Sequence, residues 1–191
     1  MSRSEHLRQI LANRSVKHGD FVLASGRRSS VYVDARLTTM SPDGMVLIGV
    51  LGLDEIESQG WHADSIGGLT LGADPVAYAI SHTSASRERP LRAFTVRKEA
   101  KLHGAGKLIE GPFEQDDRVV VVEDVITTGK SALQAIDTIT SAGGVVVGVL
   151  AVVDREDGGR EAITSRGYQV ASLTRISEIV SLRHSDDPGA G

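Results

Sequence analysis

Apolar positions recur along this chain at two spacings, one typical of helices and one typical of strands. Residues 3–15 show the helical spacing, whereas four consecutive valines at 119–122 predict a strand that is buried on both faces. Asp74 and Pro75 predict a helix start, with the carboxylate as N-cap and proline at the first helical position. The predicted helices cover 3–15, 43–58, 75–84, 131–141, 160–166 and 176–182. The predicted strands fall within 21–34 and at 64–68, 91–96, 119–122, 145–153 and 168–173.

This alternation of strands and helices predicts the fold class. It is typical of an α/β fold in which a mainly parallel, twisted sheet carries helices on both faces. At 191 residues the chain is long enough for one domain with a substantial core, and we expect residues 1–185 to form it. Residues 186–191 are expected to be a disordered tail.

Composition narrows the classes of function. The formal net charge is −4, which argues against a surface that binds nucleic acid or an anionic membrane. Because there is no cysteine, disulfides, thiolate catalysis and cysteine zinc sites are excluded. No apolar run reaches the roughly 18 residues of a membrane span, and the N-terminus lacks the apolar core of a signal peptide. We therefore expect a cytoplasmic protein.

The segment 119–132, VVVVEDVITTGKSA, carries the clearest chemistry. Glu123 and Asp124 are predicted to end the valine strand, a Thr-Thr-Gly turn follows, and Ser131 opens a helical pattern. The start of a helix at the carboxyl end of a parallel strand attracts an anion such as phosphate. Carboxylates beside it can accept hydrogen bonds from sugar hydroxyls. The segment therefore predicts a site for a sugar phosphate.

Two other interpretations of this segment fit less well. A purely structural turn would leave two acids without a use directly after a buried strand, which is costly. A nucleotide triphosphatase loop is suggested by Gly129, Lys130 and Ser131, but that motif needs glycine five residues before Gly129. The residue there is Asp124, whose charge would repel the phosphates that such a loop wraps.

A second segment, 97–117, has no clear periodicity and is unusually long for a loop inside a compact domain. It reads RKEAKLHGAGKLIEGPFEQDD and concentrates positive charge near three glycines. A solvated basic loop is the ordinary interpretation of such a run. In an acidic chain that also carries an anion site, we favour a mobile cationic lid over a diphosphate. Its cationic candidates are Arg97, Lys98, Lys101, His103 and Lys107.

These two segments together resemble a known family. The loop EDVITTG at 123–129 is similar to the 5-phosphoribosyl-1-diphosphate (PRPP) motif of type I phosphoribosyltransferases, and RKEAKLHG at 97–104 resembles the flexible catalytic loop of orotate phosphoribosyltransferases. FVLASGRRSSVYVDAR at 21–36 resembles the family's opening segment, which helps form a small hood, here about 1–40 over a core at about 41–175. VVDR at 152–155 and GGLTLGADPVA at 67–77 resemble its substrate-side strand end and diphosphate-side loop.

The resemblance implies a glycosyltransferase of the pentosyltransferase class that converts orotate and PRPP to orotidine 5′-monophosphate and diphosphate, in de novo pyrimidine synthesis. It implies Mg²⁺, bound mainly through PRPP and water and aided by Glu123 and Asp124, and a homodimer with shared active sites. The implied catalytic residues are Lys101, His103 and Asp124, and the implied orotate-binding residues are Thr127 and Arg155. The implied PRPP-binding residues are Arg97, Lys98, Lys101, His103, Glu123, Asp124, Val125, Ile126, Thr127, Thr128, Gly129, Lys130 and Ser131.

Two alternatives share part of this pattern. A purine-type phosphoribosyltransferase would keep the PRPP loop but would not need Arg155 or the basic lid. A non-catalytic PRPP-sensing regulator would tolerate a degraded lid and would carry a DNA-binding extension. The chain also departs from some members of the family, because Ala24 and Gly72 stand where those members carry lysine.

Overall fold

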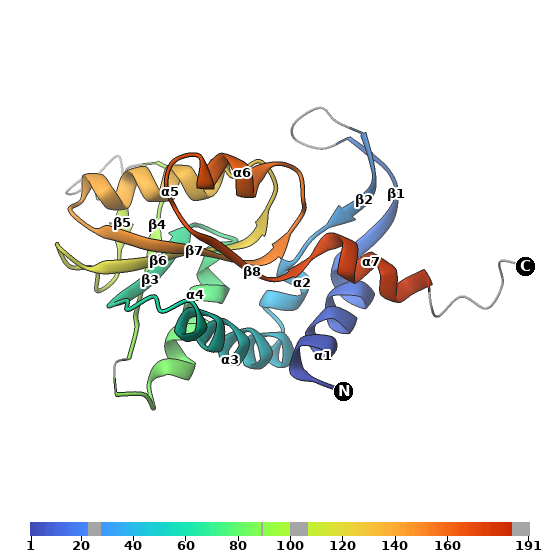
Figure 1. Ribbon diagram of the computed structural model, residues 1–191, viewed down its shortest axis with the longest axis horizontal. Helices are drawn as coiled ribbons and strands as arrows, with labels where there is room; N and C mark the ends of the chain where they lie inside the picture. Colours follow the sequence, from blue (N-terminus) through green and yellow to red (C-terminus); the bar gives the residue numbers. More distant parts are fainter. Residues whose placement is uncertain (23–27, 89, 100–106, 185–191) are drawn as a thin grey trace, which may run out of the picture.

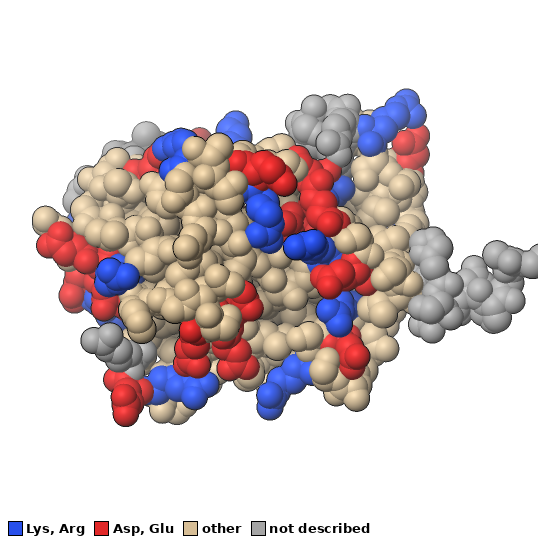
Figure 2. Space-filling view, in the orientation of Figure 1, with Lys and Arg blue, Asp and Glu red and all other residues tan. Residues whose placement is uncertain are grey.

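The structure is a computed structural model that describes residues 1–22, 28–88, 90–99 and 107–184 (Figure 1). The predicted tail, 186–191, and Ala24 lie outside the described residues. None of the described helices is long and apolar enough to cross a membrane. On the face shown in Figure 2, acidic and basic side chains of the described residues lie interspersed.

A six-stranded sheet forms the centre of the fold, with strand order β5-β4-β3-β6-β7-β8. All neighbouring strands are parallel except β4 and β5, which pair antiparallel. The predicted α/β fold with a mainly parallel sheet is therefore confirmed. The strands are β3 (Ser65–Leu69), β4 (Arg92–Val96), β5 (Ile109–Glu110), β6 (Arg118–Ile126), β7 (Val145–Asp154) and β8 (Val170–Arg175).

Helices cover both faces of the sheet (Figure 1). One face carries α1 (Arg3–Ile10), α3 (Pro42–Ser58), α4 (Ala73–Ser84) and α7 (Ile176–His184), and the other carries α5 (Lys130–Ser141) and α6 (Gly159–Thr164). The chain runs from α1 into a π-helical turn, Leu11–Ser15, so the predicted helix at 3–15 changes hydrogen-bonding pattern after its second turn.

The valine strand shows why the sheet is covered twice. Val119, Val120, Val121 and Val122 are all fully buried. Val120 and Val122 pack in the core under α3 and α4, whereas Val119 and Val121 pack in the core under α5. Alternate side chains of a strand point to opposite faces, so a run of apolar residues stabilises a strand only between two helical layers.

Within the predicted hood, β1 (Val16–Val22) and β2 (Arg28–Val33) form a separate two-stranded antiparallel sheet. Val16 pairs with Val33, which brings the two ends of this hairpin together beside the π-helical turn. A short helix, α2 (Arg36–Thr39), leads from the hairpin to α3. The hood and core boundaries stay predictions.

Three local expectations were wrong. Strand β6 does not end at the acid pair, because Val125 and Ile126 continue its pairing with β7. The segment 97–117 contains the short strand β5, which has too few residues to show a periodicity. Helix α4 begins at Ala73 and has no side-chain cap. Asp74 does not cap it, because its carboxylate accepts hydrogen bonds from the hydroxyls of Thr70 and Thr95, at 2.7 and 2.9 Å.

Candidate active site

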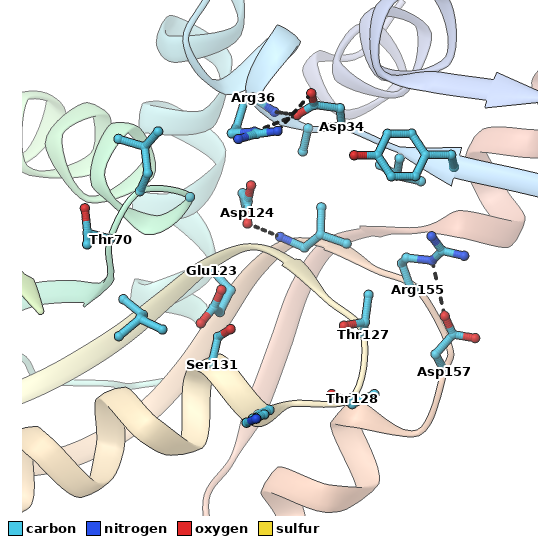
Figure 3. Close-up of a pocket in the computed structure, with 18 of the residues that line it drawn as sticks. Asp34, Arg36, Thr70, Glu123, Asp124, Thr127, Thr128, Ser131, Arg155 and Asp157 are labelled. Carbon is cyan, nitrogen blue, oxygen red and sulfur yellow. Dashed lines mark hydrogen bonds and ion pairs between the residues drawn. The ribbon is translucent and has the colours of Figure 1, made fainter. Parts of the chain in front are cut away.

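A cleft of about 710 Å³ opens where the carboxyl ends of β3, β6 and β7 meet the hood (Figure 3). Open α/β sheets bind ligands at this edge. Residues of the acid pair, the Thr-Thr-Gly turn, the start of α5 and the hood all line it. The cleft therefore brings together segments that are far apart in the sequence.

The turn between β6 and α5 forms one end of the cleft. Gly129 has a φ of 77°, a left-handed conformation in which a glycine avoids the strain of a side chain, and α5 begins directly after it without a side-chain cap. The turn encloses a small hollow of about 30 Å³, bordered by the hydroxyl residues Thr127, Thr128 and Ser131. First-turn backbone N–H groups of a helix attract anions, so the turn around this hollow suits the binding of a phosphate group.

Gly159, at the start of α6, supports this turn from behind. A Cβ atom at position 159 would lie 2.4 Å from the carbonyl oxygen of Thr127 and 2.8 Å from the backbone nitrogen of Gly129. The turn therefore keeps its shape because two backbone segments approach closely where a side chain is missing. Sequence reasoning missed this residue, although the pair Gly158-Gly159 was visible as a signal of irregular backbone.

Glu123 lies in the middle of the cleft and is 5% exposed. Its Oε1 atom is buried and has no hydrogen-bond partner among the described residues. Burial is the main cause that raises the pKa of this carboxyl well above its ordinary value, the charge of Asp124 adds to the effect, and Lys98 opposes it. A buried carboxylate oxygen that faces a cleft without a partner is suited to accept a hydrogen bond from a ligand.

Asp124 faces the opposite side. Figure 3 shows its side chain toward Asp34 and Arg36, whereas Glu123 lies toward Ser131. Burial raises the pKa of Asp124, while a hydrogen bond from the backbone N–H of Val125, at 2.8 Å, and the charge of Arg36 lower it. The acid pair thus serves two sides of one strand.

Gly72 allows Asp124 to occupy this position. A Cβ atom at 72 would lie 2.5 Å from Oδ1 of Asp124. The peptide bond between Thr70 and Leu71, just before it, is cis. The lysine that some family members carry at this position would therefore collide with the carboxylate of Asp124 as it is placed here. Glycine at position 72 and this position of Asp124 thus belong together.

Asp34 and Arg36 belong to the cleft and were missed by sequence reasoning. The guanidinium of Arg36 binds Asp34 through two hydrogen bonds, Nε to Oδ1 at 2.8 Å and Nη2 to Oδ2 at 3.1 Å. This pair lowers the pKa of Asp34 and raises that of Arg36. The segment VYVDAR contained both residues, but nothing in its pattern marked them as cleft residues.

Arg155 forms the other end of the cleft, directly after β7. Its side chain is 7% exposed, and its Nε atom lies 3.3 Å from Oδ2 of Asp157. Its Nη2 atom donates to the Ser29 hydroxyl at 3.4 Å and to the carbonyl oxygen of Val31 at 3.3 Å, both in β2. A buried guanidinium between the core and the hood suits a planar carboxylate ligand.

Most of the predicted site residues meet in this cleft. Glu123, Asp124, Val125, Thr127, Thr128, Lys130, Ser131, Lys98 and Arg155 line it, and Gly129 borders the small hollow. Ile126 is 2% exposed and packs in the core under α5, so it contributes through its backbone at most. Arg97 lines a neighbouring depression, with Nη1 3.8 Å from Glu110. Lys101 and His103 lie outside the described residues.

Comparisons with known proteins agree with this geometry. No family model matches the chain. The chain is 44% identical over 183 residues to the orotate phosphoribosyltransferase of Aquifex aeolicus, which covers 94% of this chain and 99% of that relative. The orotate phosphoribosyltransferase of Mycobacterium tuberculosis, solved with Fe(III) dicitrate, matches with a TM-score of 0.82 and 43% identity over 93% of this chain and 99% of that one. The same protein solved with PRPP matches with a TM-score of 0.78 and 40% identity, over the same shares of the two chains.

Each of these matches extends over nearly the whole length of both proteins, so each includes both ends of the cleft. Sequence identity of 40–44% over nearly the whole of both chains indicates membership of the same family, and not only the same fold. The chain therefore belongs to the orotate phosphoribosyltransferase family and has the type I phosphoribosyltransferase fold.

Proposed function

We propose that this protein transfers the 5-phosphoribosyl group from PRPP to orotate, giving orotidine 5′-monophosphate and diphosphate in de novo pyrimidine synthesis. The observation that carries the proposal is the cleft itself, with a turn of hydroxyl residues at a helix start at one end and a buried guanidinium at the other. Between them lies the acid pair, Glu123 and Asp124. A purine substrate has no carboxylate and would not need Arg155.

The proposed roles follow the order of groups along the cleft. Thr127, Thr128 and Ser131 and the first turn of α5 hold the 5′-phosphate, and Glu123 and Asp124 accept hydrogen bonds from the ribose hydroxyls. The orotate carboxylate binds Arg155. Because orotate supplies the attacking nitrogen, the chain needs no nucleophilic side chain and acts by positioning two anionic substrates and stabilising the leaving diphosphate.

The cationic segment supplies the charge for that diphosphate. Lys98 lines the cleft, and Arg97 begins the segment beside it. We propose that Lys101 and His103, further along the same segment, complete the set of diphosphate contacts. A segment that closes over the substrates also excludes water, which would otherwise hydrolyse the reactive sugar.

The proposal includes Mg²⁺. Among the described residues, no group of three or more His, Asp or Glu side chains is placed to hold a metal ion. The unpartnered Oε1 of Glu123, with Asp124 beside it, fits an ion that arrives with PRPP and water and takes one or two protein oxygens at most. When bound, Mg²⁺ would stabilise negative charge on the phosphate oxygens.

A cytoplasmic location stays a prediction.

A spectrophotometric assay of orotate consumption with PRPP and Mg²⁺ tests this function, with adenine, hypoxanthine and uracil as control substrates. Asp124→Ala is expected to reduce kcat/KM by more than about tenfold while the protein stays folded, because charge-assisted hydrogen bonds are worth about 1.5–3 kcal/mol. A variant with wild-type kcat/KM would contradict the ribose assignment. Turnover of a purine with none of orotate would contradict the function.

We further propose a homodimer in which the cationic segment of one subunit completes the site of the other. Three apolar side chains on the hood side are 47–66% exposed, which supports a protein contact there: Leu37 on α2, Met40 directly after α2 and Val46 in the first half of α3. Lys101→Ala and Asp124→Ala are each expected to be nearly inactive. When the two variants are unfolded and refolded together, mixed dimers should contain one intact site.

Random mixing makes about half of the dimers mixed, so activity should approach about a quarter of wild type if the sites act independently. Sites confined to one subunit would always contain one lesion. Activity no higher than the mean of the two parents, with mixed dimers demonstrated by mass spectrometry, would exclude a shared site.

A further inference from the structure

Asp157 has no role in the function proposed so far, yet it lines the same cleft as Arg155. Its side chain is 12% exposed, and its Oδ2 atom lies 3.3 Å from Nε of Arg155 (Figure 3). Nε itself makes no hydrogen bond with acceptable geometry among the described residues. The two charges are therefore buried side by side without the close, well-aligned contact that makes a buried ion pair stabilising.

The chain between these residues is built to hold this arrangement. Glu156 has a φ of 57°, a left-handed conformation that non-glycine residues seldom adopt. Its backbone N–H donates to Oδ1 of Asp154 at 2.8 Å, and its own carboxylate accepts from the backbone N–H of Ser177 at 3.1 Å. Hydrogen bonds from both sides thus hold Glu156 in a costly backbone conformation, which is a frequent sign of a functional constraint. The turn at Glu156 therefore positions the side chains of Arg155 and Asp157 in the same cleft.

The guanidinium is fixed on two sides. Asp157 lies along its Nε side, and the hood strand β2 accepts both hydrogen bonds from Nη2, at 3.4 Å to Ser29 and 3.3 Å to Val31. Both of these bonds are near the upper limit for hydrogen bonds, so they are weak. The guanidinium of Arg155 is thus oriented jointly by the neighbouring carboxylate of Asp157 and by two weak hydrogen bonds to β2.

We propose that Asp157 is a positioning and specificity-determining residue: it orients the Arg155 guanidinium for a single planar carboxylate and offsets its charge so that phosphate groups do not occupy that end of the cleft. This inference rests on the proposed orotate-binding role of Arg155. A lone buried arginine would attract a phosphate dianion more strongly than a carboxylate, since the attraction grows with the charge of the ligand. PRPP carries three phosphoryl groups, so a cleft that binds both substrates needs such a distinction.

Kinetics with Asp157→Asn, Asp157→Ala and the conservative Asp157→Glu test the proposal. Asp157→Asn removes the charge and keeps the shape. It is expected to raise the KM for orotate about tenfold and to leave the KM for PRPP within about twofold. It should also reduce the ratio of kcat/KM for orotate to that for uracil, which lacks the carboxylate. Inorganic phosphate should become a competitive inhibitor toward orotate, and Asp157→Glu should restore part of the orotate preference.

Glu161→Gln, an exposed carboxyl on the neighbouring helix α6, serves as the matched control and should change none of these values. Equal changes in both KM values, or an unchanged ratio of orotate to uracil in folded Asp157 variants, would overturn the positioning role. If Asp157→Asn does not fold, the same ratio measured for Asp157→Glu decides the question. Wild-type protein that consumes no orotate would instead overturn the proposed function.

Discussion

The two ends of the cleft are built in different ways. The end that we propose holds the 5′-phosphate, here called the phosphate end, is formed by one continuous segment, from β6 through the Thr-Thr-Gly turn into α5. The end that we propose holds the orotate carboxylate, here called the carboxylate end, is assembled from β2 and the turn after β7. Its Arg155–Ser29 contact joins residues 126 positions apart. The first end offers backbone groups that a helix start provides, whereas the second offers side chains that only the completed fold brings together.

The difference also concerns cost. Backbone N–H groups at a helix start need no buried charge, and the supporting contact of the turn is a close approach at Gly159. At the other end, Arg155 and Asp157 are both nearly buried. Burying two charges removes their hydration, and imperfect geometry does not fully offset that loss. Such a geometry is weak evidence for a role in stability, and we attribute the pair to ligand recognition.

Removing Arg155 would break the carboxylate end and should have the largest effect. We expect Arg155→Ala to lower kcat/KM for orotate about 100-fold or more, because the ligand loses a charge-assisted contact. The KM for PRPP should stay within about twofold. Initial rates with each substrate varied in turn measure both values, and Arg166→Ala, which removes a half-exposed pair with Asp137, is the control. Comparable losses for both substrates would argue against separate ends.

Filling the space behind the turn would break the phosphate end. In Gly159→Ala the new Cβ would lie 2.4 Å from the carbonyl oxygen of Thr127, so the turn must shift. We expect the KM for PRPP to rise about tenfold, with little change in the KM for orotate. Gly158→Ala is the matched control, since position 158 has a φ of 89° but nothing within 4 Å of a new Cβ. That control should lower thermal stability and leave the KM for PRPP unchanged; a rise equal to that of Gly159→Ala would refute the packing argument.

The same contrast explains what the sequence could predict. The sheet, most helices and the phosphate end follow from local patterns, because four valines, two acids and a glycine turn are contiguous. The length of β6 could not be predicted, since its last residues are strand only through their pairing with β7. Asp157, Ser29 and Gly159 were missed for a related reason. Their importance comes from the contacts that they make in the folded chain, and no sequence pattern indicates those contacts.

Glu123 lies between the two ends and adds a third case to the comparison, because a single buried carboxyl at the centre of the cleft lowers the free energy of unfolding when it is charged. Its Oε1 atom is buried without a partner among the described residues, and burial raises its pKa well above the ordinary value of 4.5. The folded protein therefore binds the proton more tightly than the unfolded chain does. The contribution of this group to the free energy of unfolding is greatest below pH 4.5 and falls as the pH rises from 4.5 to the pKa in the folded state.

Glu123→Gln removes this cost and should give the smallest change. At pH 8 the variant is expected to be more stable than wild type by about 1 kcal/mol, or about 2–4 °C in Tm for a chain of this size. The advantage should be smaller at pH 5, because the raised pKa favours the protonated, uncharged form of the wild-type carboxyl as the pH falls. Thermal unfolding followed by circular dichroism at both pH values measures it, and Glu57→Gln, an exposed carboxyl on α3, should show neither effect. A variant that is less stable than wild type at pH 8 would mean that Glu123 supports the fold as well as the ligand. The cost of burying charge in this cleft would then be confined to its carboxylate end.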